Sequence, residues 1–278
     1  MLWQTRTQTF DLARRGVVMG VLNVTPDSFS DGGRWLDVDA AVAHGAEMFS
    51  QGAQIVDVGG ESTRPGAEPV AESEELRRVL PVIERLAALG VVVSIDTMKA
   101  NVAREACAAG ASVINDVSGL RDEAMLLAVK ETGAGAVIMH MKGEPLTMQT
   151  APRYENVTRE VQDSFCTAME RCLRCGVPAQ NLIFDPGIGF GKTVDHNLEL
   201  LRRLPELSVG ERPLLIGVSR KSFIAKVLGT DSTAPEDRLW PTVALTSYCR
   251  ERGARVFRVH DVKPNVEALR MTEAIIAG

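Results

Sequence analysis

The chain of 278 residues is long enough to bury a large core, either as one barrel-sized domain or as two small ones. Hydrophobic residues make up 45% of it and charged residues 24%, which is ordinary for a globular protein. The formal net charge of -5 argues against a surface that binds nucleic acid or an anionic membrane, and no apolar run approaches the ~20 residues of a membrane span. We therefore expect neither nucleic acid nor a membrane as a partner, although a local basic pocket for an anion remains compatible with this charge.

Two features predict a cytoplasmic protein. The segment 1–16 lacks the apolar core of a secretory signal. The cysteines are odd in number, 5 in a long chain, which argues against a disulfide framework. Cys172 and Cys175 form a C-x-x-C pair, but neither a second pair nor a nearby histidine accompanies it, so metal or redox chemistry is not expected there.

The first predicted strand leads into a conspicuous polar loop. Residues 17–22 (Val-Val-Met-Gly-Val-Leu) form a short apolar run that is typical of a strand buried on both faces. The run stops at Asn23, and a polar loop follows as far as Gly33. In enzymes with parallel strands, the loop after the carboxyl end of a strand carries chemistry. An ordinary surface loop has a similar composition, but Phe29 is a large ring in an otherwise polar segment.

Apolar runs of this kind recur along the chain and alternate with stretches of helical spacing. Several of the helical stretches end with a glycine before the next run, which is the usual C-terminal stop of a helix. The strand-like runs are 17–22, 54–58, 91–95, 112–117, 136–141, 181–184, 213–218 and 254–259. The helical stretches are 38–51, 72–89, 99–109, 122–132, 155–175, 194–204, 235–252 and 264–277.

The order of these elements predicts the fold. Eight strand–helix units in a chain of this length favour an α/β fold, a single (β/α)8 TIM barrel, over a doubly wound sheet. No linker rich in proline, glycine or serine divides the sequence, so we predict one domain over residues 1–278. The short N-terminal segment 1–16 precedes the first strand and is expected to cap the barrel floor.

Unusual polar residues follow nearly every predicted strand. Because all eight carboxyl ends of such a barrel converge on one mouth, this concentration is what catalysis in the fold requires. A barrel without a site would scatter such residues over both rims. The residues are Asn23; Asp57 with Glu61, Ser62, Thr63 and Arg64; Asp96 and Thr97; Asn115 and Asp116; His140; Asp185; Arg220, Lys221 and Ser222; and Arg258 with His260 and Asp261.

Eight motifs, in one order, connect these strand ends. They are GVLNVTPDSFSDGG (20–33), DVGGESTRPGA (57–67), SIDTMK (94–99), INDVSG (114–119), MHMKGEP (139–145), FDPGIGFGK (184–192), GVSRKSF (217–223) and FRVHDV (257–262). On these motifs the sequence resembles dihydropteroate synthase, a pterin-binding TIM-barrel family of folate biosynthesis. The resemblance implies a transferase that condenses 6-hydroxymethyl-7,8-dihydropterin pyrophosphate with p-aminobenzoate, gives 7,8-dihydropteroate and pyrophosphate, and is the target of sulfonamides.

The resemblance implies that Asp96, Asn115, Asp185 and Lys221 line the pterin slot. A buried carboxylate can accept two N–H donors of the aminopyrimidinone edge at once, and an amide can supply and accept the rest. The residues alone leave other interpretations open. Asp185 begins an Asp-Pro-Gly sequence that is also a good turn, and Asp96 could cap the helix after Thr97.

The resemblance places Asn23, Arg258 and His260 at the pyrophosphate. Arg258 and His260 alternate along one predicted strand, so they are expected to point to the same face and to share one anion. Asn23 is implied to contact Mg²⁺, the expected cofactor, which usually keeps most of its waters and takes few protein ligands. In this family the pterin substrate is thought to ionise first. Pyrophosphate departs, a pterin-stabilised cation forms, and the arylamine then attacks that cation.

The resemblance also implies a pocket for p-aminobenzoate. Ser222 opens a predicted helix, whose free backbone N–H groups favour a carboxylate. Asp31 has the charge suited to stabilising the developing cation. The implied pocket consists of Phe29, Thr63, Arg64, Pro65, Phe190 and Ser222. The residues implied to take part in catalysis are Asp31, Arg64, Lys221, Arg258 and His260.

Two other functions fit parts of the sequence. A pterin-dependent methyltransferase domain shares the barrel and the pterin slot, but it has no reason to keep the Ser-Thr-Arg-Pro and Ser-Arg-Lys-Ser segments that are present here. A non-catalytic pterin-binding paralogue would have degraded loops, whereas the first two loops look complete. The pair Trp240-Pro241 departs from the small residues usual in the family and lies in the seventh helix, which in relatives contributes to the face of the expected homodimer.

Overall fold

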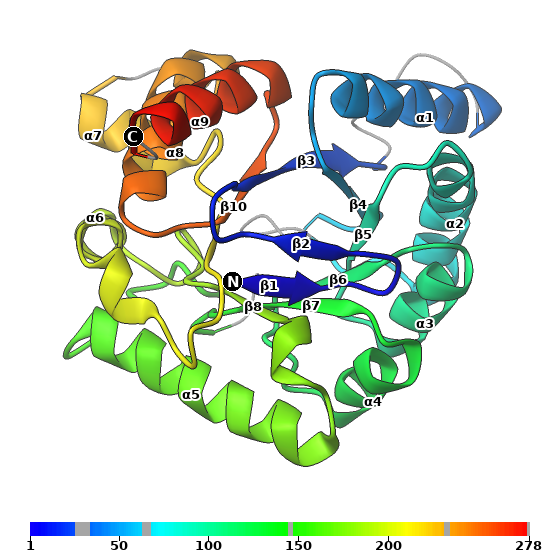
Figure 1. The fold of residues 1–278 in the computed structure, drawn as a ribbon, viewed down its shortest axis with the longest axis horizontal. Helices are drawn as coiled ribbons and strands as arrows, with labels where there is room; N and C mark the ends of the chain where they lie inside the picture. The colour runs from blue at the N-terminus through cyan, green and yellow to red at the C-terminus, as the bar shows by residue number, and fades with distance from the viewer. Residues whose placement is uncertain (26–33, 63–67, 144–146, 231–233, 277–278) are drawn as a thin grey trace.

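A closed parallel barrel forms the centre of the molecule. The computed structural model describes residues 1–25, 34–62, 68–143, 147–230 and 234–276. Within these, eight parallel strands pair in the order β8-β7-β6-β5-β4-β3-β10-β9, and a bridge between Phe184 and Leu214 joins the two ends of this series. Figure 1 shows the helices surrounding the strands. The strands are β3 (Val17–Asn23), β4 (Ile55–Gly59), β5 (Val93–Asp96), β6 (Val113–Asp116), β7 (Gly135–Met139), β8 (Leu182–Asp185), β9 (Leu215–Ile216) and β10 (Val256–Val259).

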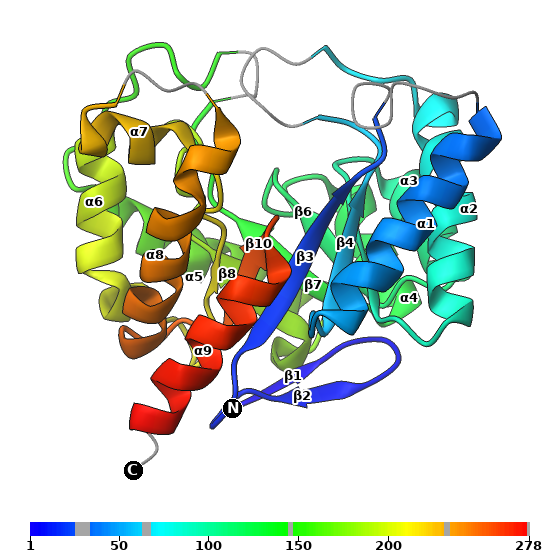
Figure 2. The same ribbon diagram turned by 90° about the horizontal axis from the view of Figure 1, so that it is seen from above.

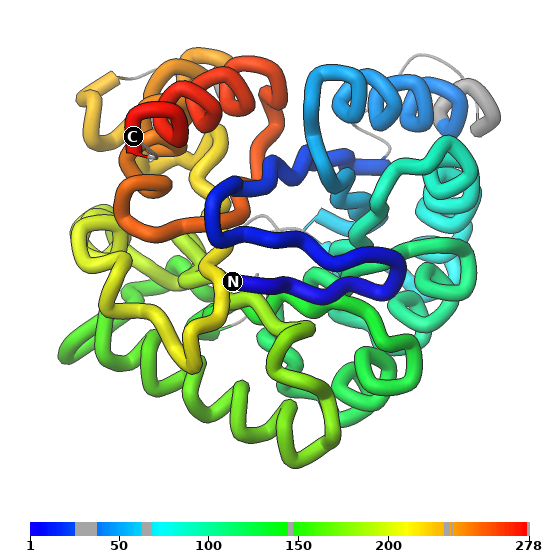
Figure 3. Tube along the Cα trace, viewed as in Figure 1, coloured from blue at the N-terminus to red at the C-terminus, as the bar shows by residue number. Residues whose placement is uncertain are grey.

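The helices follow the strands in alternation, and the chain winds around the barrel from β3 to α9 (Figure 3). The predicted (β/α)8 TIM barrel is therefore confirmed. None of the helices in the described part of the chain has the length and apolar character needed to span a bilayer. The helices are α1 (Arg34–Ser50), α2 (Glu72–Ala88), α3 (Ala100–Ala108), α4 (Glu123–Thr132), α5 (Val157–Cys175), α6 (Val194–Arg202), α7 (Ser222–Leu228), α8 (Leu239–Glu251) and α9 (Val262–Ile276).

Two predicted elements differ in detail. The run 213–218 contributes only the two residues of β9, because Pro213 has no amide hydrogen for the ladder and the chain turns away after Ile216. The helical stretch 235–252 is divided into a 3-10 turn over Pro235–Arg238 and α8. Pro241 lies in the first turn of α8, where a missing amide hydrogen breaks no intrahelical bond.

An antiparallel hairpin covers the barrel floor, as predicted for the N-terminal segment. Its strands are β1 (Leu2–Gln4) and β2 (Thr9–Asp11), and Figure 2 shows them at the end of the barrel opposite the loops that follow the strands. Trp3 is fully buried, and its indole N–H donates to the carbonyl of Asn181 at 3.0 Å. Trp3 and Leu12 pack on inward-facing residues of the barrel strands: Val17, Met19, Ile55, Val113, Val137, Ile183, Leu215 and Val256.

Candidate active site

Polar side chains from four strands meet at the mouth of the barrel. Arg258 of β10 donates from Nε to Oδ2 of Asp57 at 2.6 Å and from Nη2 to Oδ2 of Asp96 at 2.7 Å. Asn115 of β6 donates to the same oxygen of Asp57 at 3.0 Å. Asp57, Asp96 and Asn115 are buried, whereas 23% of the Arg258 side chain remains exposed. The structure therefore joins Asp96, Asn115 and Arg258, which the sequence singled out, through Asp57.

Two carboxylate oxygens in this group still have capacity to accept hydrogen bonds. Oδ1 of Asp57 and Oδ1 of Asp96 are buried, and neither has a partner among the described residues. Burial raises the pKa of Asp96 to about 7, an effect that Arg258 opposes and that Asp57 and other nearby carboxylates reinforce. Buried acceptors without partners are costly, so a ligand rich in N–H donors would find its hydrogen bonds here.

A second group forms at the ends of β8 and β9. Asp185 accepts a hydrogen bond at Oδ1 from the backbone N–H of Gly187 at 2.7 Å, so the turn role suggested by its sequence is present in the fold. Lys221 donates to the carbonyl of Ile188, and its Nζ lies 4.6 Å from the centre of the Phe190 ring. Burial lowers the pKa of Lys221 to about 8, against the attraction of Asp185.

The glycine at position 217 shows that the two groups face one another. A Cβ built on Gly217 would lie 3.8 Å from Cβ of Arg258, 3.9 Å from Oδ2 of Asp185 and 4.0 Å from Nζ of Lys221. All three side chains therefore border the space that a larger residue would occupy. Asp185 thus directs one oxygen to its own loop and the other to the mouth.

His260 and Asn23 lie at another side of the mouth. Both line a cavity of about 820 Å³ that Arg220 also borders. His260 follows β10, its backbone N–H donates to the hydroxyl of Ser219 at 3.1 Å, and its Nδ1 lies 3.1 Å from the same hydroxyl. Arg258 instead contacts carboxylates inside the barrel. The two residues expected to share an anion thus have different partners among the described residues.

A buried lysine holds the loop that carries Asp185. Only 3% of Lys192 is exposed, and its Nζ donates to the carbonyls of His140, Gly187 and Phe190 at 3.2, 3.0 and 3.0 Å. It also lies 3.0 Å from Nδ1 of His140. Burial lowers the pKa of Lys192 to about 7, with the Asp185 carboxylate opposing the shift. The contacts fasten the loop after β8 to the end of β7.

Asp57 was singled out in the sequence as a polar residue after a strand, but it was given no role; it lies two residues after Ile55 and therefore faces the same way along β4. Lys192 and Ser219 belong to quoted motifs and were also given no role. Their contacts with the end of β7 and with His260 join segments distant in the chain, which no local pattern predicts.

Of the remaining predicted residues, Ser222 and Phe190 lie in the described part of the chain and the others lie outside it. Ser222 is the first residue of α7 and is exposed, and Phe190 is half-buried. The alternative for Asp96 is wrong, because Lys99 occupies the N-cap position of α3. The predicted residues that lie outside the described part of the chain are Phe29, Asp31, Thr63, Arg64 and Pro65.

The side chains with metal-ligand chemistry do not form a cluster. Among the described residues, no three His, Cys, Asp or Glu side chains are placed to hold one metal ion. Cys172 is buried and Cys175 is partly buried, and both are free thiols. Met139 and Met141 are buried in an apolar cluster against which Phe190 packs.

Comparisons with known proteins show the family of the chain. Residues 19–260 match the model of a family described as pterin binding enzyme. The dihydropteroate synthase of Escherichia coli (strain K12) is 47% identical over 262 residues, which are 94% of this chain and 92% of that protein.

Solved structures of similar proteins include two complexes. The Yersinia pestis dihydropteroate synthase in complex with a sulfonamide drug superposes with a TM-score of 0.93, at 45% identity and 100% coverage of both chains. The Xanthomonas albilineans dihydropteroate synthase with 4-aminobenzoic acid has a TM-score of 0.90, at 45% identity, over 97% of this chain and 96% of that one. The chain belongs to the dihydropteroate synthase family of pterin-binding enzymes.

Proposed function

We propose that the chain condenses 6-hydroxymethyl-7,8-dihydropterin pyrophosphate with p-aminobenzoate to give 7,8-dihydropteroate and pyrophosphate. The observation that carries this proposal is the barrel mouth, where buried carboxylates with unused acceptor capacity lie beside cationic side chains. Membership in the family supplies the substrates. The named activity of the similar proteins from E. coli and Y. pestis supports the same reaction.

The pterin is assigned to Asp96, Asn115, Asp185 and Lys221. Oδ1 of Asp96 and Oδ2 of Asp185 accept the N–H donors of the pterin edge. The amide of Asn115 is fixed by Asp57, so its orientation is set before the ligand arrives. Lys221 supplies a donor to the ring's carbonyl or nitrogen acceptors. The burial of these groups supports this assignment. On an open surface water would form their hydrogen bonds, whereas in the buried mouth a ligand has to do so.

The pyrophosphate is assigned to Asn23, His260 and Arg258. A cavity that Asn23, His260 and Arg220 border supports this placement for Asn23 and His260; Arg258 does not line it, and α1, α8 and α9 supply most of its other residues. Mg²⁺ fits here with Asn23 as its protein ligand, because the amide offers a hard oxygen and this ion keeps most of its waters. When bound, Mg²⁺ supplies charge neutralisation to the leaving group. Oδ1 of Asn23 lies 3.8 Å from the position of a Cβ on Gly59, so it faces the mouth.

The reaction forms one bond and breaks another at the same carbon. The bond from the pterin methylene carbon to the pyrophosphate oxygen breaks, and its electron pair leaves with pyrophosphate. The amine of p-aminobenzoate then donates its lone pair to that carbon and loses a proton to water. We propose that ionisation comes first, because the mouth places carboxylates where positive charge develops. Asp31 is proposed to add a further negative charge.

The pocket for p-aminobenzoate is proposed from the two long loops and the α7 end of the mouth. Phe190 and the stem of Lys221 offer an apolar surface for the aryl ring. Ser222, at the start of α7, offers backbone and hydroxyl donors to the carboxylate. The first two loops are proposed to complete the pocket with Phe29, Thr63, Arg64 and Pro65.

We also propose a homodimer located in the cytoplasm. Large apolar side chains are exposed on α7, α8 and α9, and Trp240 among them is 72% exposed, which supports association with a second copy. All five cysteines are free thiols, as expected in a reducing compartment. Light scattering at micromolar concentration tests the dimer, with a Trp240→Glu variant expected to shift the molecular mass towards the monomer.

The assay that tests the reaction combines purified protein, the pterin pyrophosphate, p-aminobenzoate and Mg²⁺. Release of pyrophosphate together with dihydropteroate, inhibited by a sulfonamide in competition with p-aminobenzoate, is the expected result. Arg64→Ala and Asp31→Ala should abolish turnover while pterin binding persists. Pterin binding without turnover in the unaltered protein would instead indicate a non-catalytic paralogue, and methyl transfer from methyltetrahydrofolate would indicate the methyltransferase alternative.

A further inference from the structure

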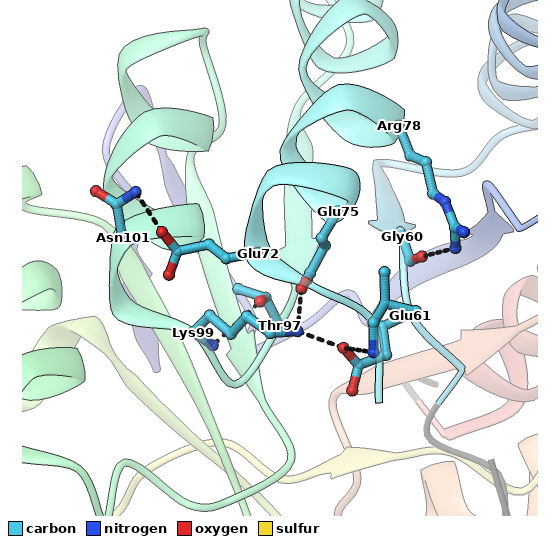
Figure 4. A network of polar contacts seen from close by, with 9 residues as sticks. Gly60, Glu61, Glu72, Glu75, Arg78, Thr97, Lys99 and Asn101 are labelled. Carbon is cyan, nitrogen blue, oxygen red and sulfur yellow. Dashed lines mark hydrogen bonds and ion pairs between the residues drawn. The ribbon is translucent and has the colours of Figure 1, made fainter. Parts of the chain in front are cut away.

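A buried charged triad lies beside the mouth, outside the groups described above. Lys99 follows β5 and donates hydrogen bonds to Glu61, after β4, and to Glu75, in the first turn of α2 (Figure 4). We call these three residues the Lys99 triad. Glu75 is fully buried and 10% of the Glu61 side chain is exposed, whereas 26% of the Lys99 side chain is exposed. The triad therefore joins three segments that are separate in the sequence.

The carboxylate of Glu61 also closes the base of a loop. Its Oε2 accepts the backbone N–H of Val70 at 3.2 Å, so one side chain ties together the two residues that flank the segment 62–69. Gly60, the residue before Glu61, is held as well, because Arg78 of α2 donates to its carbonyl at 2.8 Å. Gly60 is thus fastened to α2, and Glu61 is fastened to Lys99 after β5 and, through Lys99, to Glu75 of α2 (Figure 4).

The charges of the triad indicate a specific role. Burying two carboxylates and one ammonium costs desolvation that their attraction only partly offsets, so such a cluster is a weak source of stability. Its hydrogen bonds connect the residues that follow β4 and β5 to each other and to the first turn of α2. A buried ionic cluster of this kind is suited to fixing the position of the segments it joins.

We propose that the Lys99 triad fixes Glu61 and Val70, the residues on either side of the segment 62–69, and thereby sets the affinity for p-aminobenzoate without setting that for the pterin. The inference rests on the proposed function, which assigns Thr63, Arg64 and Pro65 to p-aminobenzoate. Lys99 is on this account a positioning residue, since it contacts the flank of the segment and no proposed pterin ligand. Asp96, by contrast, is held by Arg258.

Steady-state kinetics of Lys99→Met test the proposal. Loss of a charge-assisted hydrogen bond at the loop base should raise the KM for p-aminobenzoate about tenfold, with the KM for the pterin pyrophosphate unchanged within twofold. Lys99→Arg, which can still reach both carboxylates, should restore most of the affinity. A matched control is Asn101→Ala. Asn101 donates to Glu72 at 2.9 Å and links the same two helices without touching either end of the segment (Figure 4).

A second readout is independent of catalysis. Hydrogen exchange, followed by mass spectrometry, should show the amides of residues 62–70 exchanging about tenfold faster in Lys99→Met than in Asn101→Ala. If Lys99→Met does not fold, the double variant Lys99→Met/Glu75→Gln, which neutralises the more deeply buried of the two carboxylates left without a cation, takes its place in both experiments. Equal rises of the two KM values, or unchanged exchange in a folded variant, would overturn the proposal. An inactive unaltered protein would count against the proposed function alone, because the exchange experiment would still decide on the triad.

Discussion

The floor and the mouth of this barrel are built from the same strands but follow opposite rules. Ile55, Val113, Ile183 and Val256 pack in the apolar floor under Trp3. Two residues further along each strand, the inward position is a polar residue of the mouth: Asp57, Asn115, Asp185 and Arg258. Because side chains alternate across a strand, positions two apart face the same way, and one step along the barrel changes apolar packing into buried charge.

The difference separates stability from chemistry. In the floor, the cluster under Trp3 is apolar and the one polar atom of Trp3 has a hydrogen-bond partner. The exception on these strands is Ser94, two residues before Asp96 on β5, whose buried hydroxyl has no partner among the described residues. In the mouth, buried oxygens of Asp57 and Asp96 lack partners within the described residues. Substitutions that remove packing in the floor should therefore lower the stability of the fold. Substitutions in the mouth should instead weaken ligand binding and change the stability little.

The largest expected effect is on the floor. Trp3→Ala removes a fully buried ring and its hydrogen bond, so the free energy of unfolding should fall by about 4 kcal/mol. Denaturant unfolding measures it. Leu89→Ala is the control, since Leu89 is 59% exposed and lies at the end of α2, outside the proposed dimer face, and should cost less than ~0.5 kcal/mol. Equal losses in the two variants would remove the distinction that we draw for the floor.

A mouth substitution should affect catalysis instead. Asp185→Asn keeps the size of the side chain but replaces one acceptor by a donor. We therefore expect kcat/KM for the pterin substrate to fall about hundredfold, which corresponds to a loss of about 3 kcal/mol in transition-state stabilisation. The control Asp195→Asn changes an exposed aspartate on α6 and should leave kcat/KM unaltered. A decrease of less than threefold for Asp185→Asn would mean that this carboxylate does not hold the pterin.

The support beneath the mouth should matter less. Lys192→Met leaves three backbone carbonyls without their shared donor, so the loop bearing Asp185 should loosen and the Kd for the pterin should rise about tenfold. Calorimetric titration measures the Kd, with the exposed Lys130→Met as control. An unaltered Kd would show that the loop keeps its position without this lysine.

The smallest effect is on the pH dependence of pterin binding. The ionised form of Asp96 accepts the pterin donors, and its pKa is raised to about 7, so the affinity should fall about tenfold when the pH is lowered from 8 to 6. The Asp96→Asn variant should bind more weakly, with no such slope. Titrations at four pH values test this, and an equal slope in both proteins would assign the titration to another group.

Much of this architecture could be predicted from the sequence because it depends on local patterns. The apolar runs marked every strand, and the polar residue after each run marked the mouth. The motifs of the family supplied the substrates. What periodicity cannot give is the pairing of side chains from distant segments, such as Arg258 with Asp57 or His260 with Ser219. Those contacts depend on how the barrel closes, and so does the role of Lys99.

The short β9 and the early Pro241 show the same limit at the level of secondary structure. The apolar run around Ile216 predicts a longer strand, but the ladder ends where the chain turns into the mouth at Gly217. Such boundaries follow from closure of the barrel, which overrides the local preference for a strand.

The most direct test of the division between floor and mouth is the free energy of unfolding of Asp96→Asn at pH 8. The raised pKa means that ionising Asp96 destabilises the fold, and this cost grows as the pH rises from about 4 to 7. A neutral side chain of the same shape should therefore give stability at or above that of the unaltered protein, while pterin affinity falls. A loss as large as that of Trp3→Ala would contradict the account, because the mouth would then carry the stability that we assign to the floor.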